Sequence, residues 1–102
     1  AKASVLTLLT YNYSRLLGRE KRYEECIEVA QYGYDICVKY NKCQEMGGVL
    51  LNIACALHDL GRDKESKSKL LDSYYAYRLM QRYSSCDVIK KYAMDTWGEV
   101  LF

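Results

Sequence analysis

The sequence predicts an all-α fold of about five antiparallel helices, on the evidence of its composition and its apolar spacing. The chain of 102 residues contains no proline, and residues that favour helices dominate it. The alternation of apolar and polar residues that is typical of strands is absent. Several windows instead place apolar residues three and four positions apart, with short polar stretches between them. Residues 1–102 are therefore expected to form one domain with a single modest core.

The first helix is expected over residues 4–18 and the second over about 22–42. Ser4 is a suitable N-cap residue, and the polar stretch 19–21 supplies the turn between the helices. Neither helix can bury an apolar face alone, so the two should fold back on each other and pack on a further partner. The side chains expected to face inward are Val5, Leu8, Leu9, Tyr13, Leu16 and Leu17 on the first helix, and Tyr23, Cys26, Ile27, Ala30, Tyr34, Cys37 and Val38 on the second.

Three more helices are expected, over residues 44–60, 63–82 and 85–97. Gly61 suits the positive φ that often follows a helix end, and Gly98 ends the last helix. Asp63 is the expected N-cap of the fourth helix, and a Ser-Ser-Cys-Asp cluster begins the fifth. The side chains expected to face inward are Leu50, Ile53, Ala54 and Leu57 on the third helix, and Ser66, Leu70, Leu71, Tyr74, Tyr77 and Leu79 on the fourth.

The two helix pairs match each other when one is shifted by 40 residues. Small residues recur at equivalent positions where the helices of a pair cross: Ser14, Cys26 and Gly33, then Ala54, Ser66 and Ser73. A 40-residue helix–turn–helix period is typical of an α-solenoid. The sequence therefore predicts two helix pairs and a closing fifth helix.

The segments LLGREKRYEECIEVAQYGYDICVKYN and LHDLGRDKESKSKLLDSYY, with a last helix ending in WGEVLF, carry a family resemblance. They resemble lengthened tetratricopeptide (TPR) repeats, and in particular the C-terminal TPR domain of Gram-positive peptide-sensing transcription factors of the Rgg/PlcR type, in the helix-turn-helix XRE class. Asp63 and Ser66 depart from the aromatic residue and the alanine usual in a TPR repeat. The resemblance implies a regulatory domain that binds a short peptide in its concave groove. Any DNA-binding head is expected outside this chain, which begins at Ala1 and is expected to be a fragment.

Composition excludes several other classes of function. The net charge is only +2 and no basic stripe occurs, which argues against direct nucleic-acid contact. Five cysteines without a CxxC spacing fit a reducing cytoplasm better than a secreted disulfide framework. No signal peptide and no apolar stretch of membrane length is present. A cytoplasmic protein without membrane contact is expected.

The first helix of each pair should line the concave side of a solenoid, and this places a set of candidate binding residues. Asn12 and Asn52 fall at the same repeat position, where two amides could form a ladder along a peptide backbone; the alternative is a pair of solvated polar residues. Equivalent positions on the three helices are Tyr11, Asn12, Arg15 and Arg19, then Leu51, Asn52, Cys55 and Asp59, then Lys91, Tyr92 and Asp95.

The charged and aromatic residues in this set can each be interpreted in two ways. Arg15 and Arg19, one helical turn apart, could hold a peptide's C-terminal carboxylate, or they could be solvated or paired with Glu20. Most of the eleven tyrosines are expected in the core, but Tyr11 and Tyr92 should point toward the groove.

Neither a cofactor nor a metal nor catalysis is indicated. Cys55 and His58 lie three residues apart on one helix, but no second ligand pair accompanies them. No recognisable motif gives His58 a nucleophile or an acidic partner, so an enzyme is not expected. The apolar end of the chain, Trp97, Val100, Leu101 and Phe102, should either cap the solenoid or form a homodimer contact.

Overall fold

The computed structural model describes residues 2–42 and 44–101, and these residues form five α-helices and no strand. The prediction of an all-α fold is therefore confirmed for the described part of the chain. None of these helices combines the length and the apolar character needed to cross a membrane. The helices are α1 (Lys2–Arg19), α2 (Tyr23–Lys39), α3 (Met46–Asp59), α4 (Asp63–Leu79) and α5 (Tyr83–Trp97).

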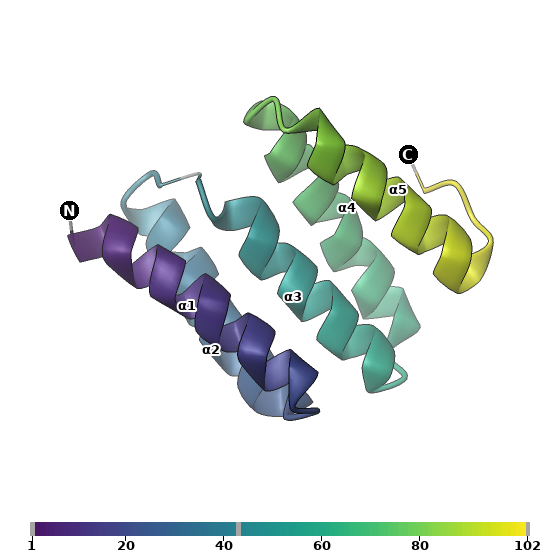
Figure 1. Ribbon diagram of the computed structural model, residues 1–102, viewed down its shortest axis with the longest axis horizontal. Coiled ribbons are helices and arrows are strands. Elements are labelled where there is room, and N and C mark those ends of the chain that lie inside the picture. The colour runs from purple at the N-terminus through teal and green to yellow at the C-terminus, as the bar shows by residue number, and fades with distance from the viewer. Residues whose placement is uncertain (1, 43, 102) are drawn as a thin grey trace.

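The five helices are arranged in two layers (Figure 1). Helices α1, α3 and α5 lie side by side in one layer, and α2 and α4 lie behind them. The shortest dimension of the molecule is 18 Å, close to the width of two packed helices at about 10 Å each. Helix α3 is central, because its residues contribute to all three apolar clusters of the core.

The 40-residue repeat is present in the pattern of burial. In α1 and α3 the buried positions that match are Thr7, Thr10, Ser14 and Leu17, against Gly47, Leu50, Ala54 and Leu57. In α2 and α4 they are Cys26, Ala30, Gly33, Ile36 and Cys37, against Ser66, Leu70, Ser73, Ala76 and Tyr77. All six small residues predicted at the helix crossings are buried.

Serine hydroxyls join α4 to α3 across this crossing. Ser66 Oγ donates a hydrogen bond to the backbone carbonyl of Ala54 at 2.6 Å, and Ser73 Oγ donates to that of Gly47 at 2.7 Å. A small polar side chain at a crossing lets the two backbones approach while its own hydroxyl remains satisfied. Ser66 therefore replaces the alanine usual in a TPR repeat without leaving a buried polar group unpaired.

The turns repeat every 20 residues. In each turn a residue with positive φ follows the helix end: Lys21, Asn41, Gly61 and Gln81. The N–H of the next residue then bonds to a carbonyl five positions back, as in Arg22 to Leu17 and Arg62 to Leu57. This is the Schellman arrangement, which satisfies carbonyls at the helix end. At Gly61 the positive φ is free of the cost imposed by a Cβ atom, and asparagine tolerates it at Asn41, so these two turns have a sequence signal that Lys21 and Gln81 lack.

The predicted inward face of α1 is wrong, except for Leu17. Val5, Leu8, Leu9, Tyr13 and Leu16 are exposed, and the buried positions are Thr7, Thr10 and Ser14. The two threonine hydroxyls donate to carbonyls one turn back in α1, so they are satisfied without a partner on another helix. The reason is close approach, because around Thr7, Thr10 and Ser14 the side of α1 that meets α2 and α3 has room only for short side chains. Leu17, near the end of α1, is the exception.

Other predicted details also need correction. Val38 and Leu79, expected in the core, are exposed near the ends of α2 and α4. Asp63 is the first residue of α4, preceded by Arg62 as the cap, and α5 begins at Tyr83 rather than at the Ser-Ser-Cys-Asp cluster. Ser4 lies within α1. Gly61 and Gly98 have the positive φ expected of residues that follow a helix.

Candidate functional site

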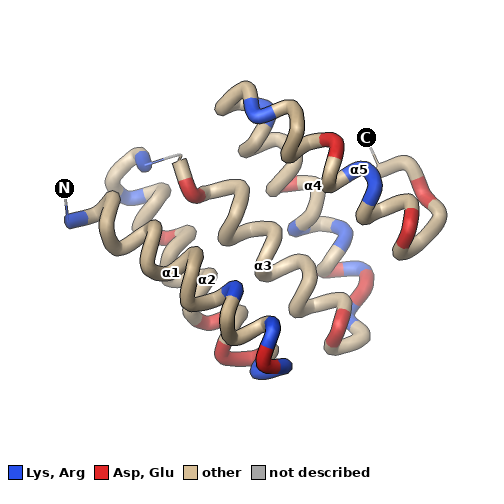
Figure 2. The backbone as a smooth tube through the Cα atoms, viewed as in Figure 1, with Lys and Arg blue, Asp and Glu red and all other residues tan. Residues whose placement is uncertain are grey.

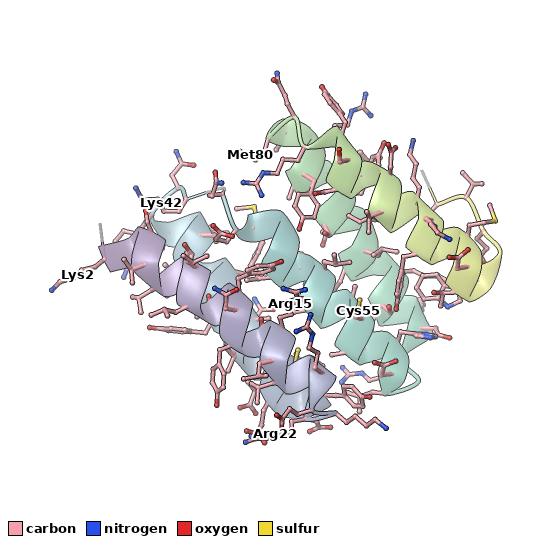
Figure 3. The ribbon with its side chains drawn as sticks, viewed as in Figure 1. Lys2, Arg15, Arg22, Lys42, Cys55 and Met80 are labelled. Carbon is pink, nitrogen blue, oxygen red and sulfur yellow. The ribbon has the colours of Figure 1, made fainter. Side chains whose placement is uncertain are left out.

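A cavity of about 220 Å³ lies between α1 and α3, near the beginning of α2. Four of the residues predicted to bind a peptide line it: Arg15, Arg19, Asn52 and Asp59. Figure 3 shows Arg15 extending from α1 toward α3. The remaining lining residues are Ser14, Gly18, Tyr23, Cys26, Cys55 and Ala56. The repeat register thus places several of the predicted residues around one cavity.

The charged groups at this cavity are available to a ligand. Arg15 and Arg19 are exposed and make no ion pair or hydrogen bond with the residues that the structure describes. Asp59, on α3, is also exposed and forms no ion pair there. Two guanidinium groups on one helix can bind a carboxylate through charge-assisted hydrogen bonds. The cavity therefore favours an anionic group beside α1.

The two predicted asparagines have different surroundings. Asn52 Nδ2 donates to the backbone carbonyl of Tyr11 at 3.1 Å and to Ser14 Oγ at 2.9 Å. Its two amide protons are thus used to join α3 to α1. Asn12 is exposed and does not line the cavity. The pair therefore does not present two free amide groups along one groove, and the amide ladder is not supported.

Tyr11 and Leu51 serve mainly in packing. Tyr11 is half-buried and packs against the cluster of Ala30, Val49, Ile53 and Leu57, and its ring lies over Gly48, where no Cβ atom would fit. Leu51 packs against a second cluster, the cluster around Leu70, whose buried members are Ala54, Leu70, Tyr74, Tyr77, Cys86, Ile89 and Ala93. The expectation that Tyr11 points toward the groove is therefore wrong.

The predicted residues of α5 also have partners within the chain. Lys91 Nζ lies 2.7 Å from Asp95 Oδ2, one turn along the same helix. The Tyr92 ring meets the His58 ring of α3 edge-on at 6.4 Å and packs against the cluster around Leu70, and the Tyr92 hydroxyl lies beside the Cys55 thiol. Burial is the largest cause of the raised pKa of Tyr92, and the neighbouring Cys55 raises it further. Tyr92 joins α5 to α3 rather than facing an open groove.

The thiols at the cavity are not activated nucleophiles. Burial raises the pKa of Cys26 to about 11, and the nearby Cys55 adds to the effect. Burial also raises the pKa of Cys55. Because the thiolate is the reactive form, both side chains behave as small neutral core groups. No three His, Cys, Asp or Glu residues gather at a metal-binding distance in residues 2–42 and 44–101.

The C-terminal residues pack onto the chain itself. Trp97 and Leu101 contact the cluster around Leu70, which α3, α4 and α5 form together. The indole ring of Trp97 meets the His58 ring edge-on at 5.5 Å, and Lys67 Nζ lies 5.3 Å from its centroid. These contacts favour the capping role for Trp97 and Leu101. Val100 is exposed, and Phe102 lies outside the described residues.

A short hydrogen bond fixes the turn beneath this cap. His58 Nδ1 lies 2.6 Å from Asp63 Oδ1. This contact is the main cause of the lowered pKa of Asp63. The buried indole Nε1–H of Trp97 has no hydrogen bond of good geometry, but it lies close enough to the Asp63 carboxylate to lower its pKa further. Asp63 therefore links the α3–α4 turn to the end of α5 instead of capping α4.

The floor of the cavity was not predicted as part of the site. The small residues Ser14, Gly18, Cys26 and Ala56 line the cavity there, together with Tyr23. The signal was present in the sequence, because Ser14 and Cys26 are two of the small residues that repeat after 40 positions. Small side chains at neighbouring crossings leave a hollow where the larger rim residues diverge.

Compared with protein-family models, with curated proteins and with solved structures, the chain gives no match.

Proposed function

We propose that the chain is a TPR-like helical-hairpin solenoid that binds a short linear peptide, or an extended segment of a protein, at the α1–α3 cavity. The repeated burial pattern and the repeated turns support the solenoid part of this proposal. Together with the resemblance to Rgg/PlcR-type regulators, they favour a cytoplasmic regulatory domain of a transcriptional regulator. Binding would need no catalytic group and no cofactor.

The observation that carries the proposal is the pair of unpartnered guanidinium groups beside a cavity. Arg22 and Arg62 each form a salt bridge with a glutamate three residues later, whereas Gly18 and Arg22 occupy that position after Arg15 and Arg19. Arg15 and Arg19 have no such partner among the described residues. Their charge is therefore available for the C-terminal carboxylate of a peptide, or for an acidic side chain. Asp59, across the cavity, suits an N–H group or a cation of the same ligand.

The position of the cavity suggests how binding would be transmitted. Asn52 joins α3 to α1 directly at the cavity through two hydrogen bonds. A ligand held by Arg15 on α1 and Asp59 on α3 would favour one spacing of these two helices over another. A ligand shifts such an equilibrium by its difference in affinity for the two arrangements. The helix pair α1–α2 would then move relative to α3–α4.

We expect Arg15→Gln and Arg19→Gln each to weaken the binding of a peptide with a free carboxylate by about tenfold. The ligands are fluorescent peptides selected from a library, and the measurement is their anisotropy at low salt. Each peptide is tested with a free and with an amidated C-terminus. Arg78→Gln is the matched control, because Arg78 is also exposed but lies on α4, in the other layer.

The binding measurements with library peptides distinguish peptide binding at the cavity from an alternative function. No saturable binding, or equal weakening by Arg15→Gln and Arg78→Gln, would contradict binding at the cavity. The alternative is a structural adaptor that holds a protein partner through an end of the helix array. The exposed apolar residues of α1 favour this alternative, whereas the internal packing of Trp97 and Leu101 does not place it at the C-terminus.

A further inference from the structure

One side of α1 exposes large apolar side chains along almost the whole helix. Val5, Leu6, Leu8, Leu9, Tyr13 and Leu16 are between 39% and 57% exposed. No charged residue occurs between Lys2 and Arg15, and Figure 2 shows this stretch of α1 free of charge. Contiguous apolar surface of this kind usually marks an interaction site. The question is which partner covers it.

The 40-residue repeat identifies the kind of partner. The positions on α3 that match Leu9, Tyr13 and Leu16 are Val49, Ile53 and Ala56, and all three are buried. Val49 and Ile53 cluster with Ala30, with Ile27 and Tyr34 of α2 beside them. Ala56 clusters with Leu17 and Cys26. The corresponding side of α3 is thus covered by the α1–α2 hairpin.

A polar residue on α1 supports the same conclusion independently. Asn52 uses its amide group to reach the preceding helix of its layer, α1. Tyr92, 40 residues later, also contacts the preceding helix of its layer, since its ring meets the His58 ring of α3 edge-on. Asn12, 40 residues earlier, is exposed and forms no hydrogen bond with the described residues. Its amide is placed to bond to a helix that would lie before α1 in this layer.

The opposite end of the array does not offer such a surface. Helix α5 turns Cys86, Ile89 and Ala93 inward, and its exposed side mixes Tyr83, Val88 and Met94 with charged residues such as Asp87 and Lys90. Charged residues on an outer face are typical of the terminal element of a repeat array. A second copy stacked end to end would therefore place charged side chains of α5 on the uncharged stretch of α1, a poor match.

Two copies joined through their α1 helices also match poorly. The charged residues of α1 are Lys2, Arg15 and Arg19, and the helix has no acidic residue. An antiparallel pair of α1 helices would place Lys2 of one copy near Arg15 and Arg19 of the other, and a parallel pair would align identical charges. Like charges at such positions disfavour pairing. The charges thus favour a different helix as the partner.

We propose that the exposed side of α1 is the docking surface for a further helical hairpin of the same 40-residue type. The second helix of that hairpin would present small and apolar side chains to Leu9, Tyr13 and Leu16, as α2 presents Ile27, Ala30 and Tyr34 to α3. Its first helix would offer a backbone carbonyl to Asn12, as α1 offers that of Tyr11 to Asn52. This surface is separate from the cavity lined by Arg15 and Arg19, and the proposal does not depend on peptide binding.

The test adds a copy of the α1–α2 hairpin, which packs on α3 in the present chain, in front of α1. Tyr11 of the copy is changed to Ala, because Leu8 stands where α3 has Gly48 beneath the Tyr11 ring. A second copy of residues 3–42 is placed directly before Ala3, which keeps the 40-residue register. Leu9→Glu is then introduced at the original Leu9, both in this extended chain and in the 102-residue chain. We expect the thermal midpoint of the 102-residue chain to change by less than about 2 °C, because Leu9 is exposed there, and that of the extended chain to fall by about 8 °C or more.

Three results would overturn the proposal. One is an equally small change in both chains, which would show that the added hairpin leaves Leu9 exposed. Another is an extended chain without additional helical circular dichroism, since residues 3–42 fold against α3 in the present chain. The third is a 102-residue chain that is dimeric by light scattering and becomes monomeric with Leu9→Glu, because the occupant would then be a second copy. Asn12→Ala gives a second readout and should destabilise only the extended chain.

Discussion

Replacing Gly33 by alanine is expected to destabilise the protein by about 2–4 kcal/mol and to lower its thermal midpoint by about 10 °C or more. Gly33 is buried in α2 at the point where α1 and α3 both approach it. A Cβ atom at this position would collide with the Thr10 side chain, coming within 2.8 Å of Thr10 Cβ, and would lie 3.3 Å from Val49 Cγ1. Thr10 cannot rotate away from this contact, because its own Cβ is part of it. Thermal unfolding followed by circular dichroism measures the effect.

The same substitution at Gly18 is the matched control, and it should not lower the stability of the protein. A Cβ atom there would lie 3.7 Å from Cys26 Sγ, an ordinary contact distance. Alanine is the better helix former by about 1 kcal/mol, so Gly18→Ala is expected to leave stability unchanged or to raise it. If both variants were stabilised, helix propensity alone would explain the results and the close approach at Gly33 would be refuted.

Replacing Ser14 by leucine should have the second large effect, lowering the free energy of unfolding by about 3 kcal/mol. Ser14 is fully buried in α1, and its hydroxyl accepts a hydrogen bond from Asn52 Nδ2 at 2.9 Å. Leucine would overfill the crossing of α1 with its neighbours, and it would leave one Asn52 proton without its acceptor. Urea unfolding of both chains gives the difference in the free energy of unfolding.

The comparison is Leu16→Gln, which removes an apolar side chain from the same helix. Leu16 is exposed, so its loss should change the free energy of unfolding by less than about 1 kcal/mol. The pair of variants tests the rotation of α1 directly. A large loss at Leu16 with little change at Ser14 would mean that α1 buries the face predicted from its amphipathic pattern.

The α1 helix illustrates what the spacing of apolar residues alone could not reveal. The spacing of its apolar residues correctly predicts a helix, but it does not specify which face of the helix meets α2 and α3. At a close helix crossing the buried residues must be short, so Thr7, Thr10 and Ser14 are buried while the leucines are exposed. Packing distance thus overrides side-chain hydrophobicity. The repeat register contained this information, because Gly47 and Ala54 occupy the same positions in α3.

The candidate site was predictable in part. Repeat position alone identified Arg15, Arg19, Asn52 and Asp59, and these residues line one cavity. Their partners could not be deduced, since the hydrogen bonds of Asn52 depend on how closely α1 approaches α3. The turns also could not be fully predicted, because Lys21 and Gln81 adopt a positive φ that is normally signalled by glycine.

The most direct test of peptide binding at the α1–α3 cavity is a titration followed by backbone amide chemical shifts. A peptide selected for a free C-terminal carboxylate is added to the ¹⁵N-labelled chain. We expect saturable shifts in α1 around Arg15 and Arg19 and in α3 between Asn52 and Asp59, and none for the amidated peptide. Shifts confined to α4 and α5, or identical shifts for both peptides, would contradict the account.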